Sequence, residues 1–199
     1  MIRTNDWVYI HIPKTSGTNF IKVSEEKEKN LNNYFIKYNK YFSHQPLWWW
    51  ENKGLVNKDD LVFSIVRNPY DRFVSFYNHI QNNLKVIDFE YFIKNNHIEK
   101  INYYVEKNSS EFANLLVWKC EWTQTQFLKS NFDKNVSVYK LEEDFKNLEQ
   151  LVGYTFSDTF YNKRNHKEWR QYYNQYTLDA IYSIYKEDFL NFDYKREKI

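Results

Sequence analysis

Cysteine and long apolar runs are scarce in this sequence, and both scarcities exclude classes of protein. The single cysteine among 199 residues, Cys120, cannot form an internal disulfide, so folding does not depend on an oxidising compartment. No apolar run reaches the roughly 20 residues that span a bilayer. Residues 1–6 also lack the long apolar stretch of a signal peptide. We therefore expect the chain as given to be soluble and intracellular, in the cytoplasm.

An excess of charge of either sign is also missing. Lys and Arg number 28 and Asp and Glu number 26, a formal net charge of +2, so nothing demands nucleic acid as a partner. An anionic ligand must then be held by a local arrangement of groups. Aromatic residues, by contrast, make up 21% of the chain. This bias is typical of an AT-rich genome, and the alternative is a stacking surface for sugars or bases.

Short β-rich segments alternate with segments of helical spacing. Strands are predicted at Trp7–Ile12, Tyr34–Phe42, Leu61–Val66 and Val136–Leu141. Helices are predicted at Thr18–Asn30, Tyr70–Ile80, Ile87–Asn95, Glu111–Lys119, Glu142–Leu151 and from an N-cap at Thr177 to about Phe189. No repeat or low-complexity linker interrupts this alternation. We therefore predict one α/β domain over residues 1–199, with a largely parallel sheet flanked by helices.

The segment HIPKTSGTNF, residues 11–20, has the parts of an anion-binding loop. N–H groups at the start of a helix converge on one spot, where the helix dipole favours negative charge. Gly17 allows close backbone approach, Lys14 adds a full charge, and hydroxyl groups follow from Thr15, Ser16 and Thr18. This is not a Walker A loop, because Lys14 precedes the only glycine of the segment. An ordinary strand-to-helix turn is the alternative for the segment taken alone.

A second basic site lies in FSIVRNPYDRFVSFY, residues 63–77. Arg67 ends a predicted buried strand, and Ser75 lies eight residues later on the following helix. Ligands of open α/β sheets bind at the carboxyl ends of strands, so Lys14 and Arg67 can line the same edge. An arginine there suits bidentate capture of a phosphate. For Asp71 and Arg72 we favour a surface ion pair or a packing role.

These two segments together resemble a known family. HIPKTSGT is similar to the 5′-phosphosulfate loop, and VRNPYDRFVSFY to the 3′-phosphate motif, of carbohydrate sulfotransferases that use 3′-phosphoadenosine 5′-phosphosulfate (PAPS). Weaker similarity continues through VYKLEEDFKNLEQL and IYSIYKEDFLNFDY, in the branch of the uronyl 2-O- and related Golgi sulfotransferases. The resemblance implies a P-loop-like parallel sheet of the sulfotransferase fold, PAPS as donor, a hydroxyl acceptor on a glycan, and no metal. It also implies the Golgi lumen if a membrane anchor has been removed.

The resemblance assigns donor contacts residue by residue. Lys14 would contact the bridging oxygen between sulfonate and phosphate, and Thr15, Ser16, Gly17 and Thr18 would hold the 5′ phosphate. Arg67 and Ser75 would hold the 3′ phosphate. Asn19 stands where serine is common in the family, a tolerable change. The family carries a cofactor-covering loop near the basic run NKRNHKEWR, which would close over the 3′ phosphate or grip an anionic acceptor; Arg164 is the candidate there, and a solvated face is the alternative.

The acceptor hydroxyl must lose a proton, and histidine is the side chain best suited to this near neutral pH. His44 follows the predicted second strand and so reaches the same sheet edge; the resembling branch places its catalytic histidine there. The alternative for His44 is a structural role, with Glu25 or Glu26 then as the base. We interpret His11 and His79 as structural and His97 as solvated.

Other residues carry weaker signals. Gln126 is a candidate for positioning the acceptor, Cys120 is assigned to packing, and Trp48–Trp50 could stack on sugar rings or belong to the core. Two further functions stay open at this point. One is a P-loop kinase or nucleotide phosphotransferase, which would need Mg²⁺. The other is a non-catalytic module that binds a nucleotide.

Overall fold

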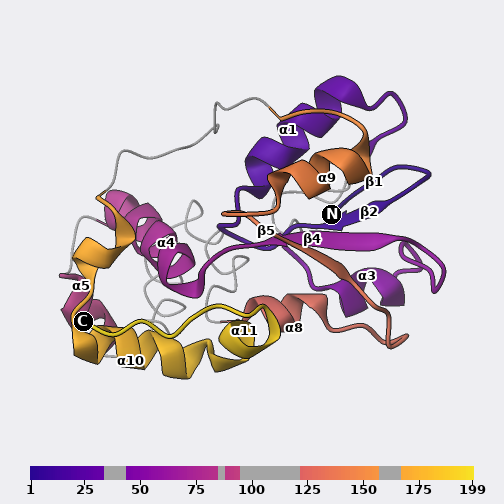
Figure 1. Ribbon diagram of the computed structural model, residues 1–199. Coiled ribbons are helices and arrows are strands. Elements are labelled where there is room, and N and C mark those ends of the chain that lie inside the picture. The colour runs from indigo at the N-terminus through magenta and orange to yellow at the C-terminus, as the bar shows by residue number, and fades with distance from the viewer. Residues whose placement is uncertain (34–43, 85–87, 95–121, 157–166) are drawn as a thin grey trace. The chain divides into compact units, whose positions relative to one another are not determined.

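The computed structural model describes residues 1–33, 44–84, 88–94, 122–156 and 167–199 (Figure 1). The chain divides into two compact units. The first comprises Met1–Arg67 and Gln124–Lys163, and the second comprises Asn68–Thr123 and Arg164–Ile199. That residues 1–199 act as one domain stays a prediction. The predicted strand at 34–42 and helix at 111–119, together with His97, Cys120 and Arg164, lie outside the described residues.

A five-stranded sheet forms the centre of the first unit, in the order β3-β1-β2-β4-β5. Its strands are β1 (Ile2–Arg3), β2 (Val8–Ile10), β3 (Asn32–Asn33), β4 (Val62–Val66) and β5 (Ser137–Lys140). β2 pairs in parallel with β4, and β4 with β5, whereas β1 is antiparallel to both β2 and β3. The α/β prediction with a parallel sheet is therefore confirmed for the strands that carry the candidate site. The antiparallel edge was not predicted.

Helices cover both faces of this sheet, as the alternation of its side chains requires. On one face, Tyr9 and Phe63 pack with Phe20 of α1 (Gly17–Lys27) and Leu148 of α9 (Phe145–Val152). On the other, side chains of β2 and β4 pack with Leu47 and Trp50 of α3 (Leu47–Asn52). Figure 1 shows α1 and α9 on one side of the strands, with α3 and α8 (Gln124–Leu128) on the other.

The second unit is helical and has an aromatic core. Its elements are α4 (Pro69–Leu84), α5 (Phe89–Lys94), a 3₁₀ turn (Trp169–Tyr172), α10 (Gln175–Ile184) and α11 (Lys186–Asn191). Phe73, Phe76 and Tyr77 are buried on α4, so one face of this helix forms part of the core of the second unit. Arg72 is also buried; it donates a 3.0 Å hydrogen bond to the Trp122 carbonyl and lies over the Tyr185 ring. Of the two roles considered for Arg72, the structure shows packing.

The N-cap prediction at Thr177 is wrong. Asn174 is the N-cap, and its side chain accepts the Thr177 N–H while the Thr177 hydroxyl accepts the Asn174 N–H. Thr177 is thus the third residue of a capping box, where a threonine can replace the usual Glu or Gln. The predicted helix to Phe189 also divides at Tyr185 into α10 and α11.

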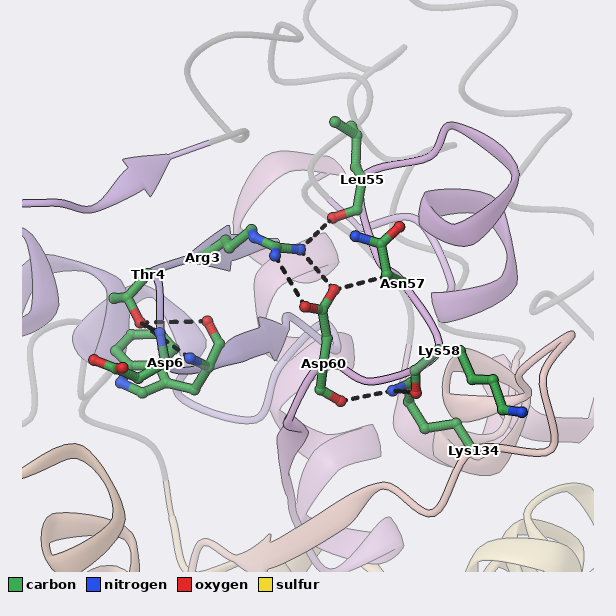
Figure 2. Close-up of polar contacts among 9 residues, drawn as sticks. Arg3, Thr4, Asp6, Leu55, Asn57, Lys58, Asp60 and Lys134 are labelled. Atoms are coloured by element: carbon green, nitrogen blue, oxygen red, sulfur yellow. Dashed lines mark hydrogen bonds and ion pairs between the residues drawn. The ribbon is translucent and has the colours of Figure 1, made fainter.

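A charged cluster fastens β1 to the loop before β4 (Figure 2). The Arg3 guanidinium donates to both carboxylate oxygens of Asp60, at 2.7 and 2.9 Å, and the Asn57 N–H donates to the same carboxylate at 2.7 Å. Lys134 donates to the carbonyl oxygens of Lys58 and Asp60. Burial acts to raise the pKa of Asp60, but the hydrogen bonds from Arg3 and Asn57 and the charges of Arg3 and Lys134 outweigh it, so the pKa lies below its usual value.

No helix within the described ranges has the length and apolar character needed to cross a membrane.

Candidate functional site

The loop between β2 and α1 has an unusual backbone. Lys14 and Ser16 have φ angles of 67° and 64°, in the left-handed region that residues other than glycine rarely adopt. Such conformations cost on the order of 1–2 kcal/mol each, and they persist where the surrounding structure holds them. Left-handed residues within a turn are also how successive N–H groups come to face a common centre and form an anion-binding nest.

Backbone donors at the start of α1 are available to a ligand. The N–H groups of Asn19 and Phe20 donate to the Ser16 carbonyl, at 3.0 and 3.3 Å. Those of Ser16, Gly17 and Thr18 donate to no group in the part of the chain that the structure describes. An 11-residue helix directs its partial positive charge to the same place. These N–H groups and the helix dipole are the features that an anion-binding loop requires.

The three hydroxyl groups of the loop are not equivalent. Thr15 is fully buried, and its hydroxyl donates to the Ile12 carbonyl at 3.0 Å. The hydroxyl proton of Thr15 thus stabilises the turn. If Thr15 contacts an anion, the contact is made by its backbone. Ser16 is partly exposed and Thr18 is exposed. Their hydroxyl groups can meet a ligand from solvent.

Arg67 follows β4 and reaches this loop. Its guanidinium Nη1 donates to the Lys14 carbonyl at 3.3 Å, so the two cations predicted to share a sheet edge are neighbours. Gln124 holds the backbone of Arg67 from both sides. Its Oε1 accepts the Arg67 N–H at 2.9 Å, and its Nε2 donates to the Arg67 carbonyl at 2.8 Å. Gln124 is completely buried, whereas Gln126, the predicted acceptor-positioning residue, is partly exposed.

A buried polar layer lies beneath the loop. A Cβ placed on Gly17 would lie 2.1 Å from His11 Cδ2, 2.2 Å from His11 Nε2 and 2.7 Å from the Tyr9 hydroxyl. Burial, followed by the nearby positive charges of His44, the amino terminus and Lys14, lowers the pKa of His11 well below its usual value. Burial also raises the pKa of the Tyr9 phenol. Both groups are therefore neutral near pH 7, and only glycine fits above them.

His44 lies beside His11, just before α3. Its Nδ1 is 3.2 Å from the His11 carbonyl oxygen, and the two imidazole rings are 4.3 Å apart between centroids. His44 is 7% exposed. The alternative bases are placed differently. Glu25 and Glu26 are exposed on α1, and at 1.5 Å per residue Glu25 lies about 12 Å along the helix from Gly17.

The remaining predicted residues belong to the second unit or have structural contacts. Ser75 is partly buried on α4, and His79 partly exposed on the same helix, both in the second unit. Trp50 belongs to the core, and its Nε1 donates to the Gln45 carbonyl at 3.0 Å. Trp49 packs edge-on against Trp50, and Trp48 is partly exposed. Within the described ranges, no three His, Cys, Asp or Glu side chains are grouped to hold a metal ion.

Comparison with known proteins gives one result. A family model described as the sulfotransferase family matches residues 1–195, nearly the whole chain. The match includes the loop, Arg67 and His44. No curated protein and no solved structure matches the chain.

Proposed function

The chain belongs to the sulfotransferase family, and from this premise we propose that it takes sulfonate from PAPS and transfers it to a hydroxyl group of a carbohydrate. Sulfonate transfer follows from the family itself. PAPS as donor, a glycan as acceptor and the relation to the uronyl 2-O-sulfotransferase branch are the proposed part. The observation that supports it best is the loop at residues 14–18, which has N–H donors at the start of α1 and whose Lys14 carbonyl accepts a hydrogen bond from the Arg67 guanidinium.

The residues present fit a donor with several anionic groups. The N–H groups of Gly17 and Thr18, with the hydroxyl groups of Ser16 and Thr18, suit the 5′ phosphate. Lys14 suits the oxygen that bridges phosphorus and sulfur. Arg67 suits the 3′ phosphate, because a guanidinium can bind two phosphate oxygens at once. Ser75 and Arg164 are proposed for the 3′ phosphate and for the covering loop from the motif alone.

When bound, PAPS supplies a sulfonate group joined to a phosphate that leaves readily. The acceptor oxygen forms a bond to sulfur while the bond from sulfur to the bridging oxygen breaks, and the electron pair stays on that oxygen. Lys14 stabilises the charge that develops there. His44 accepts the proton of the acceptor hydroxyl as general base. The two residues therefore act on opposite partners of one in-line displacement.

A carbohydrate acceptor is supported by the surroundings of His44. Trp48 and Trp49 are partly exposed at the start of α3, four and five residues after His44. Aromatic rings of this kind pack well against the apolar face of a sugar. The acceptor proposal thus combines the family resemblance with an aromatic segment close in the chain to the proposed base.

The direct test is to incubate the protein with PAPS and a panel of glycans and small alcohols, and to search by mass spectrometry for products that have gained SO₃. We expect a sulfated glycan, formed equally well with and without EDTA. A requirement for Mg²⁺ would indicate phosphoryl transfer instead. If PAPS binds but no product forms from any acceptor, a non-catalytic nucleotide-binding module is the better account.

A further inference from the structure

We propose that His11 is a positioning residue of the transfer site. Its carbonyl oxygen sets His44 in the tautomer that carries the proton on Nδ1, and its ring supports the anion loop at Gly17. The proposal rests on the proposed function in that it concerns how the general base and the loop are held. Neither contact requires a ligand, so both can be tested in the protein alone.

The tautomer follows from the chemistry of the partner. A carbonyl oxygen only accepts hydrogen bonds, so the 3.2 Å contact from His44 Nδ1 to the His11 carbonyl requires a proton on Nδ1. A neutral imidazole carries one proton, and the lone pair then resides on Nε2. Nε2 is therefore the nitrogen that can take the acceptor proton. In the opposite tautomer, the lone pair of Nδ1 would face the lone pairs of the carbonyl oxygen, and the two groups would repel each other.

The ring of His11 makes the second contact. Because an added Cβ at Gly17 would lie 2.1–2.2 Å from two atoms of this ring, the imidazole touches the backbone of the loop directly. The same ring lies 4.3 Å, between centroids, from that of His44. One buried side chain thus contacts both the loop that would bind the donor and the residue that would activate the acceptor.

The charge state of His11 suits this role. The His11 imidazole is neutral near pH 7 because its pKa is low. Burial is the main cause of the low pKa, and the charges of His44, the amino terminus and Lys14 lower it further. A cationic His11 would oppose proton transfer to His44 at 4.3 Å. The neutral Tyr9, whose ring stacks at 6.0 Å from that of His11, adds no charge on the other side.

The first test is the tautomer of His44, read by ¹⁵N NMR on the ligand-free protein labelled at histidine. The His44 signals are assigned as those lost in His44→Gln. At a pH where His44 is neutral, we expect Nδ1 to show the ¹⁵N chemical shift of a protonated nitrogen and Nε2 that of an unprotonated nitrogen. A dominant Nε2–H form, or an even mixture, would overturn the proposal. Because no donor or acceptor is present, this result does not depend on whether transfer is observed.

The second test is a double-mutant cycle on thermal stability, with Gly17→Ala, His11→Ala and both changes together. Gly17→Ala should lower Tm strongly because its methyl group meets the His11 ring. In the His11→Ala background, the loss of Tm caused by Gly17→Ala should be smaller by at least about 4 °C, because the His11 ring is gone and only the Tyr9 hydroxyl must shift.

Gly54→Ala is the matched control for this cycle. Gly54 also lies in the first unit, has φ +66°, and no atom lies within 4 Å of an added Cβ. Its cost comes from backbone strain alone and should add to that of His11→Ala. Equal Tm losses for Gly17→Ala in the wild-type and His11→Ala backgrounds would overturn the contact between ring and loop.

Discussion

At the scale of single residues, the roles proposed for His44 and Lys14 predict separable effects on the reaction. His44→Ala should lower kcat by about 10²–10⁴, the usual contribution of a general base, with donor affinity nearly unchanged. Lys14→Ala should lower kcat and also weaken donor binding, because its charge lies in the anion loop. Steady-state kinetics with calorimetry of donor binding separates the two. Glu25→Ala, an exposed position on α1, is the control and should retain activity. A His44→Ala variant that keeps more than about a tenth of wild-type kcat would exclude His44 as base.

Residues with a local sequence signature could be predicted, and residues that act through distant contacts could not. Lys14 and Arg67 stand next to a glycine or proline turn after apolar strands, so the sequence alone points to them. Gln124 was not predicted, because its contacts with Arg67 join positions 57 residues apart. The inward turn of the Thr15 hydroxyl and the contact of His44 with the His11 carbonyl likewise depend on the folded backbone.

At the scale of elements, the Arg3–Asp60 pair joins β1 to the loop before β4, and its contribution to stability should depend on pH. Asp60→Asn should lower the free energy of unfolding at pH 7 by about 1.5–3 kcal/mol, the usual cost for a hydrogen bond to a charged group. The folded-state pKa of Asp60 is depressed, so this stabilisation is complete above the unfolded-state pKa near 4 and is lost as pH falls through the folded-state value.

Denaturant unfolding of the wild type and Asp60→Asn between pH 7 and pH 2.5 measures this dependence. The difference between the two should shrink as the pH falls below about 4. Asp59→Asn is the control, because Asp59 is exposed beside Asp60 and should show little difference at any pH. A difference that stays constant down to the lowest pH would contradict the role of the Asp60 charge.

Elements with a clear apolar pattern were predicted within a few residues of their observed ends. Examples are β4 at Val62–Val66, buried at every position, and α9 at Phe145–Val152. The two-residue strands β1 and β3 are too short to show alternation, and their pairing with the sheet is a tertiary contact. The cap of α10 was misplaced because Asn174 and Thr177 are both good capping residues, and only the hydrogen bonds distinguish them.

At the scale of the whole molecule, positive and negative charges nearly balance, so the proposed donor binding depends on groups near the site. A net charge of +2 provides little long-range attraction for a bisphosphate nucleotide. In the proposed site, donor binding therefore depends on local groups, and those with observed geometry are the loop at 14–18 and Arg67, all in the first unit. Ser75, in the second unit, remains predicted from the motif.

The most direct test of this donor site is a comparison of melting temperatures with adenosine 3′,5′-bisphosphate and with AMP. A ligand that binds only the native state stabilises it by RT ln(1 + [L]/Kd). We predict a clear rise in Tm with the bisphosphate and a much smaller one with AMP, which lacks the 3′ phosphate. Arg67→Ala should weaken bisphosphate binding by about tenfold to a hundredfold and so remove most of the difference. Equal shifts from the two nucleotides in the wild-type protein would contradict the assignment of Arg67 and the proposal that PAPS is the donor.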